Sequence, residues 1–92
     1  LFGRDTLIMG LNAPAGARVL EIACGTGRNL GKIGATWPGT RLYGLDISAE
    51  MLKTAQEAVG LNARLAEGDA CSFDPVAALG EPEFERIVLS YS

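Results

Sequence analysis

The sequence predicts an α/β fold in which helices cover both faces of a parallel sheet. Apolar segments of strand length alternate with amphipathic segments of helix length along the 92 residues. Strands that alternate with helices pair in parallel through right-handed crossovers. The first three apolar segments also end in acidic or glycine-rich turns, as expected of strands that carry ligand-binding loops to one edge of a sheet.

Four segments are expected to form the strands, because each is an apolar run bounded by turn residues. The first, RVLEIA, follows the helix-breaking sequence PAGA. The strands are expected at residues 18–23, 40–46, 63–67 and 85–91.

Start and stop signals predict the helices. Ser48 is a suitable N-cap, Glu50 lies in the first turn and Gly60 follows the last one, so a helix is predicted over residues 49–59. Pro75 suits the first position of a short helix. The remaining helices are expected at residues 1–13, 28–37 and 74–80.

The composition argues against several classes of function. Eight basic and eleven acidic residues give a net charge of −3, and the basic residues are scattered, so nucleic acid is not an expected partner. No apolar stretch approaches the roughly 18 residues that a transmembrane helix needs, and no signal peptide is visible. The chain has no histidine, and Cys24 and Cys71 are far apart, so we expect no metal site and a reduced, cytoplasmic setting.

The stretch VLEIACGTGRNL (residues 19–30) joins the first strand to the next helix. Gly25 and Gly27 permit backbone torsions and a close approach that a Cβ atom would block. The turn can therefore lie against a ligand and direct N–H groups toward it from a helix start. Asp46 ends the second strand, 21 residues after Gly25, where a carboxylate can accept hydrogen bonds from the two hydroxyls of a ribose.

Residues at the next strand end extend this pattern. Asp69 can accept a hydrogen bond from an exocyclic amine, and the backbone N–H of Ala70 can donate one to a ring nitrogen. Ile47 or Met51 can cover a flat base with apolar surface. Each feature taken singly is also explained as a tight turn, a cap or a core residue. Their occurrence together at consecutive strand ends predicts an adenosine site.

Two glycine patterns compete for the first turn. A dinucleotide fold prefers G-x-G-x-x-G, but Leu30 stands where the last small residue of that pattern belongs. The E/D-x-G-x-G-x-G motif of class I S-adenosylmethionine-dependent methyltransferases is what the turn resembles, with Glu21, Ala23, Gly25 and Gly27 at its fixed positions. Ala23 departs from the first glycine of the motif, which is a small change in volume. The resemblance covers essentially the whole chain.

The resemblance implies a Rossmann-like parallel sheet sandwiched by helices, with S-adenosyl-L-methionine as the cofactor. Residues 1–92 then form the N-terminal, cofactor-binding portion of a methyltransferase domain, with about four strands and without the later ones. We expect a fragment with an exposed sheet edge, and therefore poor solubility or self-association of these residues alone. The implied cofactor-binding residues are Glu21, Ala23, Gly25, Gly27, Asp46, Ile47, Met51, Asp69, Ala70 and Ser90.

The family also implies a role for each of these positions. The glycine turn passes the methionine part of the cofactor, and Asp46 binds the ribose hydroxyls. Ile47 or Met51 flanks the adenine, and Asp69 with Ala70 meets its amine edge.

Four further residues, and the acceptor, are considered in the light of this resemblance. Ser90 and Tyr91 would lie near the methyl-donor end, where they can touch a substrate. Arg28 is expected to point away, because a cation near the sulfonium is unfavourable, and Arg4 either pairs with the cofactor carboxylate or lies on the surface. LFGRD, together with CGTGRNL and LSYS, also resembles methyltransferases that trimethylate the homoserine headgroup of betaine lipids. The expected acceptor is a small molecule or a lipid headgroup, and no residue is a convincing catalytic base.

Three alternatives stay open at this point. The chain could belong to an NAD-dependent oxidoreductase, which a comparison of NADH and S-adenosylhomocysteine binding would separate from a methyltransferase. It could transfer the aminocarboxypropyl group of the same cofactor, since the adenosine contacts would be identical. It could also be a non-catalytic relative that serves as an interaction module, against which retained cofactor affinity would argue.

Overall fold

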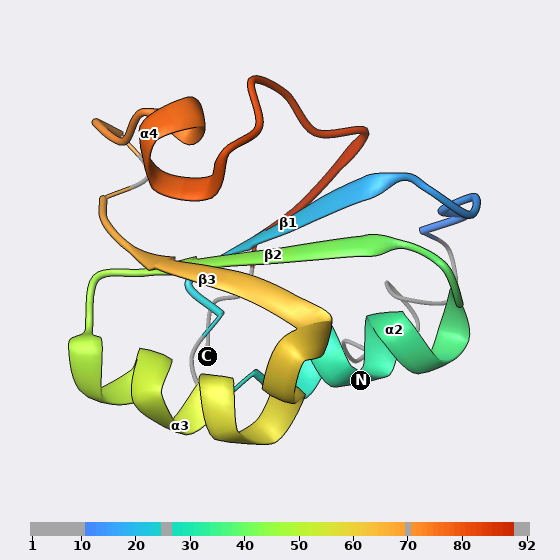
Figure 1. Ribbon diagram of the computed structural model, residues 1–92, viewed down its shortest axis with the longest axis horizontal. Helices are drawn as coiled ribbons and strands as arrows, with labels where there is room; N and C mark the ends of the chain where they lie inside the picture. Colours follow the sequence, from blue (N-terminus) through green and yellow to red (C-terminus); the bar gives the residue numbers. More distant parts are fainter. Residues whose placement is uncertain (1–10, 25–26, 70, 90–92) are drawn as a thin grey trace.

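Four parallel strands and the helices that connect them make up the fold (Figure 1). The computed structural model describes residues 11–24, 27–69 and 71–89. The strands lie in the order β3-β2-β1-β4. In chain order the elements are β1 (Arg18–Ile22), α2 (Arg28–Thr36), β2 (Arg41–Asp46), α3 (Ala49–Val59), the 3₁₀ helix η1 (Gly60–Asn62), β3 (Ala63–Glu67), α4 (Pro75–Leu79) and β4 (Arg86–Leu89).

The order in which strands are added to the sheet reverses at β1, although all four strands are parallel. From β1 the chain adds β2 and then β3 on one side, and it then returns to place β4 on the other side of β1. Right-handed crossovers therefore place α2 and α3 on one face of the sheet and α4 on the opposite face (Figure 1). Ligands of open parallel sheets bind beyond the carboxyl ends of the strands at such a reversal.

Side chains of alternate residues along each strand pack on opposite faces of the sheet. Val19 and Leu42 pack toward α2 and α3, whereas Leu20 and Tyr43 pack toward α4. The α2/α3 face is the more extensively filled core; its buried members include Val19, Leu30, Ile33, Leu42, Ala55 and Val59. On the α4 face the buried residues are Leu20, Tyr43, Leu45 and Leu79, with Ile22, Phe73 and Phe84 packed against them.

The caps of two helices confirm the start signals in the sequence. The hydroxyl of Ser48 accepts a hydrogen bond from the N–H of Met51 at the start of α3. Asp74 Oδ1 accepts from the N–H groups of Val76 and Ala77 at the start of α4, and Pro75 occupies the first turn. These contacts satisfy N–H groups that have no partner within their own helix.

The predicted α/β fold is confirmed, and the four strands and the helices from residue 28 onward lie within two residues of their expected bounds where they are described. Two boundaries were wrong. The first strand ends before Ala23, because Ala23 has a φ of 62°. The helix expected over residues 1–13 does not reach its end, because Asn12 has a φ of 51°. Residues 1–10 of that helix and residues 90–91 of the last strand lie outside the described residues.

Among the described residues, β4 has a partner strand on one side only. Ile87 and Leu89 in this strand are exposed on the α4 face, with 57% and 54% of their surface accessible. The self-association expected of residues 1–92 alone stays a prediction. A soluble monomer in analytical ultracentrifugation would contradict it.

Candidate functional site

Backbone hydrogen bonds hold the loops at the carboxyl edge of the sheet in register with one another. The N–H groups of Ala23 and Cys24 both donate to the carbonyl oxygen of Leu45, at 2.7 and 3.2 Å. The N–H of Gly68 donates to the carbonyl oxygen of Asp46 at 3.0 Å. The backbone at Ala23 and Cys24, the end of β2 and the start of the loop after β3 are therefore connected one to the next.

Gly27 occupies a position that only glycine fits. Its φ is 82°, a left-handed conformation that side chains disfavour. A Cβ atom there would also lie 3.1 Å from both Cα and Cβ of Ala55 in α3. The sequence predicted a close approach of this turn to a ligand; at Gly27 the structure shows a close approach of the backbone to the neighbouring helix α3. Gly25, the other glycine of the prediction, lies outside the described residues.

Glu21 is buried beneath the turn. Its side chain has no accessible surface, and its Oε2 accepts a hydrogen bond from Nδ2 of Asn29 in α2 at 2.9 Å. Asn29 is itself only 5% exposed. Glu21 therefore joins β1 to α2 through Asn29. The sequence analysis missed Asn29; the signal available was a polar residue on the apolar side of helix 28–37.

Cys24 fills space next to this turn. Burial, together with the nearby carboxyl groups of Glu21 and Asp46, raises the pKa of its thiol to about 12. The thiol is therefore protonated at neutral pH and chemically inert. The effect of both carboxylates on one thiol shows that their charges act on the same region of the turn.

Gly44 makes room for this arrangement, and the sequence analysis overlooked it. A Cβ atom on Gly44 would lie 2.6 Å from Cδ2 of Leu65, 2.9 Å from Cδ1 of Leu30 and 3.0 Å from Sγ of Cys24. Its signal was a glycine in the middle of an expected strand, which marks a close approach of neighbouring groups. Leu30, which argued against a dinucleotide turn, packs in the space that Gly44 leaves.

Asp46 lies at the carboxyl end of β2, where the sequence predicted it. It is half-buried, and its Oδ1 accepts a hydrogen bond from the N–H of Ser48 at 2.9 Å. This contact fixes the direction of the carboxylate. Two apolar side chains follow it: Ile47 is 74% exposed and Met51 is 39% exposed. Exposed apolar groups next to an oriented carboxylate suit a ligand with both a sugar and a flat base.

Asp69 is exposed in the loop that follows β3. Its Oδ1 accepts a hydrogen bond from the N–H of Cys71 at 2.9 Å, and its carbonyl oxygen accepts one from Ser72 at 3.0 Å. The carboxylate is thus oriented by its own loop, as Asp46 is. The predicted contacts at Ala70 and Ser90 lie outside the described residues, as do Arg4 and Tyr91.

The start of α2 differs from the starts of α3 and α4. No side chain caps it, and its first turn contains no acidic residue. Its first residue, Arg28, is exposed. A helix start of this kind, without a negative charge of its own, favours an anionic group nearby.

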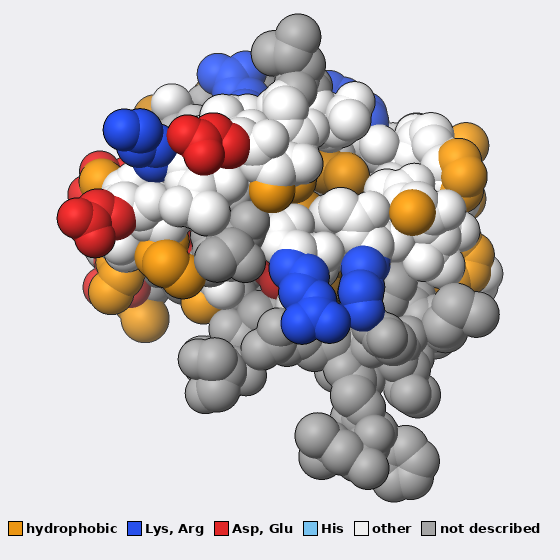
Figure 2. Space-filling model, turned by 90° about the horizontal axis from the view of Figure 1, so that it is seen from below, with side chains coloured by type: hydrophobic (Ala, Val, Ile, Leu, Met, Phe, Trp, Pro, Cys, Tyr) orange, Lys and Arg blue, Asp and Glu red, His pale blue; other side chains and the backbone are white. Residues whose placement is uncertain are grey.

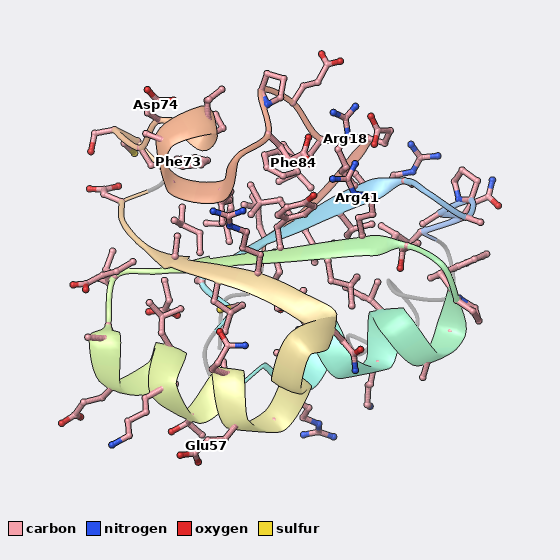
Figure 3. The ribbon with its side chains drawn as sticks, viewed as in Figure 1. Arg18, Arg41, Glu57, Phe73, Asp74 and Phe84 are labelled. Atoms are coloured by element: carbon pink, nitrogen blue, oxygen red, sulfur yellow. The ribbon has the colours of Figure 1, made fainter. Side chains whose placement is uncertain are left out.

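A polar hollow of about 560 Å³ lies at the opposite end of the strands, where they begin. We call this end of the sheet the amino edge. Arg41, Tyr43, Arg64 and Glu81 contribute to its lining. We place the functional site at the carboxyl edge instead, because Glu81 in this hollow is already bound by Arg18, Arg41 and Tyr43. Figure 3 shows Arg18 and Arg41 together at this amino edge, whereas Phe73 and Asp74 lie near the opposite end.

Two kinds of site are not found within the part of the chain that the structure describes. No group of three or more histidine, cysteine or acidic side chains could hold a metal ion. No helix in the described ranges is long and apolar enough to cross a membrane.

The sequence of residues 19–92 matches the family model described as a methyltransferase domain. The chain belongs to this family. It is 40% identical over 43 residues to a trans-aconitate 2-methyltransferase of Azoarcus sp. (strain BH72), an alignment that covers 47% of this chain and 17% of that protein. Family membership favours the methyltransferase interpretation over the oxidoreductase alternative.

Solved structures of other proteins share the fold. A TehB-like SAM-dependent methyltransferase from Corynebacterium glutamicum superposes with a TM-score of 0.75 at 25% identity, over 96% of this chain and 44% of that one. DesVI from Streptomyces venezuelae superposes with a TM-score of 0.72 at 29% identity, over 97% of this chain and 36% of that one. The chain thus spans less than half the length of these relatives.

Proposed function

We propose that the protein is an S-adenosylmethionine-dependent methyltransferase and that these residues build its adenosine-binding half-site. The observation that carries the proposal is Asp46, whose oriented carboxylate ends β2 beside the exposed side chains of Ile47 and Met51. It lies next to the turn that follows β1, at the edge where nucleoside ligands of parallel sheets bind.

Each part of the half-site has a proposed contact. Asp46 binds the two ribose hydroxyls, and Ile47 with Met51 covers one face of the adenine. Asp69 accepts a hydrogen bond from the adenine amine, and the N–H of Ala70 donates to the ring. The turn from Ala23 through Gly25 to Gly27, together with Ser90, borders the methionine part.

The protein's contribution to methyl transfer is mainly alignment. The cofactor supplies a methyl group that is already activated by a positive sulfonium. The carboxylate and the loop hydrogen bonds fix the adenosine end, so the methyl group is held in one position for in-line displacement. We expect the acceptor pocket, and any base that deprotonates the acceptor, to be formed by residues other than those named for the half-site.

We propose a small molecule or a lipid headgroup as the acceptor, in a cytoplasmic setting. The net charge of −3 and the scattered basic residues support an acceptor other than nucleic acid. On the α2/α3 side of the molecule, the visible basic side chains form a small group near the centre of the view and otherwise lie at its rim, partly beside acidic side chains (Figure 2).

Calorimetric titration of S-adenosylhomocysteine into the full-length protein tests the cofactor site. Asp46→Ala removes charge-assisted hydrogen bonds worth about 1.5 to 3 kcal/mol, so the affinity should fall roughly 10- to 150-fold. Asp74→Ala is the matched control, because Asp74 is also an aspartate that accepts backbone hydrogen bonds, but it caps α4. Tighter binding of NADH than of S-adenosylhomocysteine, or no binding of the latter, would contradict the proposal.

A further inference from the structure

The hollow at the amino edge has walls from three segments that are far apart in the sequence. They are residues 40–43 at the start of β2, residues 62–64 at the start of β3 and residues 79–81 at the end of α4. Its volume of about 560 Å³ lies in the range of small-molecule sites. Asp46 and Asp69 follow the other ends of these strands, so the hollow is separate from the proposed cofactor site.

Two arginines line the hollow from adjacent strands, Arg41 in β2 and Arg64 in β3. Tyr43 pairs with Arg64 in the register between these strands, and Arg41 precedes Tyr43 by two residues. Residues related in this way share one face of a sheet, and Tyr43 packs on the α4 face. Both arginines therefore belong to the α4 face, where Figure 3 shows Arg41.

Glu81 is the acidic residue among those that line the hollow, and cationic groups already compensate its charge. Its Oε1 accepts a hydrogen bond from Nη1 of Arg18 at 3.3 Å, and its Oε2 accepts one from the hydroxyl of Tyr43 at 2.7 Å. Nη2 of Arg41 also donates to Oε2. Glu81 therefore holds Arg41 in place, while the side chain of Arg41 remains 55% exposed to the solvent.

Arg64 adds a positive charge beyond these pairs. Among the residues that the structure describes, none forms a hydrogen bond or an ion pair with its guanidinium. A Cβ atom on Gly80 would lie 3.3 Å from Nη1 of Arg64, so the guanidinium lies directly against this glycine at the end of α4. Because Arg41 is paired with Glu81, the lining of the hollow keeps one uncompensated positive charge.

The arrangement of donors favours phosphate over carboxylate. Guanidinium groups bind both kinds of anion through paired hydrogen bonds. In this hollow the donors come from different segments, since Arg41 belongs to β2 whereas Arg64 and the amide of Asn62 belong to the segment at β3. A phosphate group has three oxygens that accept from different directions, and a phosphate monoester carries close to two negative charges at neutral pH. The two oxygens of a carboxylate lie in one plane and share a single charge.

We propose that this hollow is a second ligand site, which binds the phosphate group of a small phosphate monoester between Arg41 and Arg64. The inference goes beyond the proposed function and does not depend on it, because the two sites lie at opposite ends of the strands. A phosphate bound here joins the starts of β2 and β3 to the end of α4, and it therefore stabilises the folded protein.

Calorimetric titration of inorganic phosphate into the full-length protein, at neutral pH and constant ionic strength, tests the site. Arg64→Gln removes the uncompensated guanidinium, so the phosphate affinity should fall about tenfold or more, as for loss of hydrogen bonds between charged groups. Lys53→Gln is the matched control, because it removes an exposed positive charge from α3, outside the lining of the hollow. It should leave the affinity unchanged.

Glu81→Gln provides a test in the opposite direction. The amide oxygen still accepts the hydrogen bond from Tyr43, but the negative charge is lost and Arg41 is released toward the ligand. The phosphate affinity should rise about fivefold or more. Damage to the fold cannot produce such a gain, so this variant separates ligand binding from structural support.

Four results would overturn the inference. The wild type might show no saturable binding of phosphate, or Lys53→Gln could weaken binding as much as Arg64→Gln does, which would indicate attraction by net charge alone. Acetate that binds as tightly as phosphate would exclude the proposed ligand class. A lower unfolding temperature of Arg64→Gln with unchanged phosphate affinity would show that Arg64 only supports the end of α4.

Discussion

At the amino edge of the sheet, acidic side chains are bound by arginines, whereas at the carboxyl edge they are oriented by backbone N–H groups. Glu85 accepts hydrogen bonds from Nε and the backbone N–H of Arg18, at 2.9 and 2.6 Å. Asp46 and Asp69 each accept a bond from an N–H group two residues later in their own loops. Charges at the first edge balance each other and tie β1 to the segment before β4. Those at the second are held in fixed directions, which suits binding of a ligand.

Glycine is required at both edges of the sheet, against different neighbours. Near the carboxyl edge, a Cβ atom on Gly27 would lie 3.1 Å from Ala55 and one on Gly44 would lie 2.6 Å from Leu65. At the amino edge, Gly39 has a φ of 85° and its Cβ would lie 3.1 Å from Cβ of Ala15, and Gly80 has a φ of 76°. The tightest of these contacts is the one at Gly44, next to the turn that follows β1.

The largest expected effect is the difference in reactivity between the thiols of Cys71 and Cys24. Cys71 is exposed and Cys24 is buried with a pKa of about 12. Alkylation by iodoacetamide at pH 8 should therefore modify Cys71 at least about 100-fold faster, because only the thiolate reacts. Mass spectrometry of timed samples measures both rates. Equal rates in the folded protein would show that the turn opens readily.

Gly44→Ala should strongly destabilise the fold. The added methyl group overlaps Leu65, Leu30 and Cys24, and such overpacking costs about 1 to 3 kcal/mol. The free energy of unfolding from urea titration measures the loss. Gly31→Ala in α2 is the control, since a Cβ there meets nothing within 4 Å, and it should be neutral or stabilising by up to about 1 kcal/mol. A neutral Gly44→Ala would contradict the packing described for the turn.

Ala23→Gly should stabilise the protein by about 0.5 to 1 kcal/mol. Ala23 has a φ of 62°, and an L-residue pays about 1 to 2 kcal/mol in this conformation, partly offset by the greater freedom of glycine when unfolded. The same urea titration measures the gain. Ala35→Gly, in the exposed part of α2, is expected to change stability in the opposite direction, and a loss of stability in both variants would argue against strain at Ala23.

The amino edge should contribute a smaller, pH-dependent effect, because its ion pairs are at the surface and are screened by salt. Hydrogen bonding by Arg18 lowers the pKa of Glu85 from about 4.5 to about 2. The folded carboxyl thus holds its proton less tightly than the unfolded one, so stabilisation present above pH 4.5 is lost as the pH falls toward 2. Glu85→Gln should flatten this part of a stability profile measured by urea titration at several pH values. An unchanged slope would show that Glu85 does not contribute.

Much of this protein could be predicted from its sequence, because strand, helix and cap signals depend on local chemistry. Ser48 and Pro75 mark helix starts wherever they occur in such a context, and alternation of strands with helices restricts the sheet to parallel pairing. The positions of Asp46 and Asp69 at strand ends follow from the same periodicity. The contacts proposed for them with a cofactor stay predictions.

Only the tertiary structure decided which groups lie against one another across the turn. The hydrogen bond between Glu21 and Asn29, the collision that keeps Gly44 a glycine, and the strained φ of Ala23 depend on distances between elements that periodicity does not define. The pairing of Glu81 and Glu85 with Arg18 likewise joins residues more than sixty positions apart. The sequence by itself determined the elements and which residues lie at the carboxyl ends of the strands, because these follow from local rules. Packing between elements determined how that site is supported.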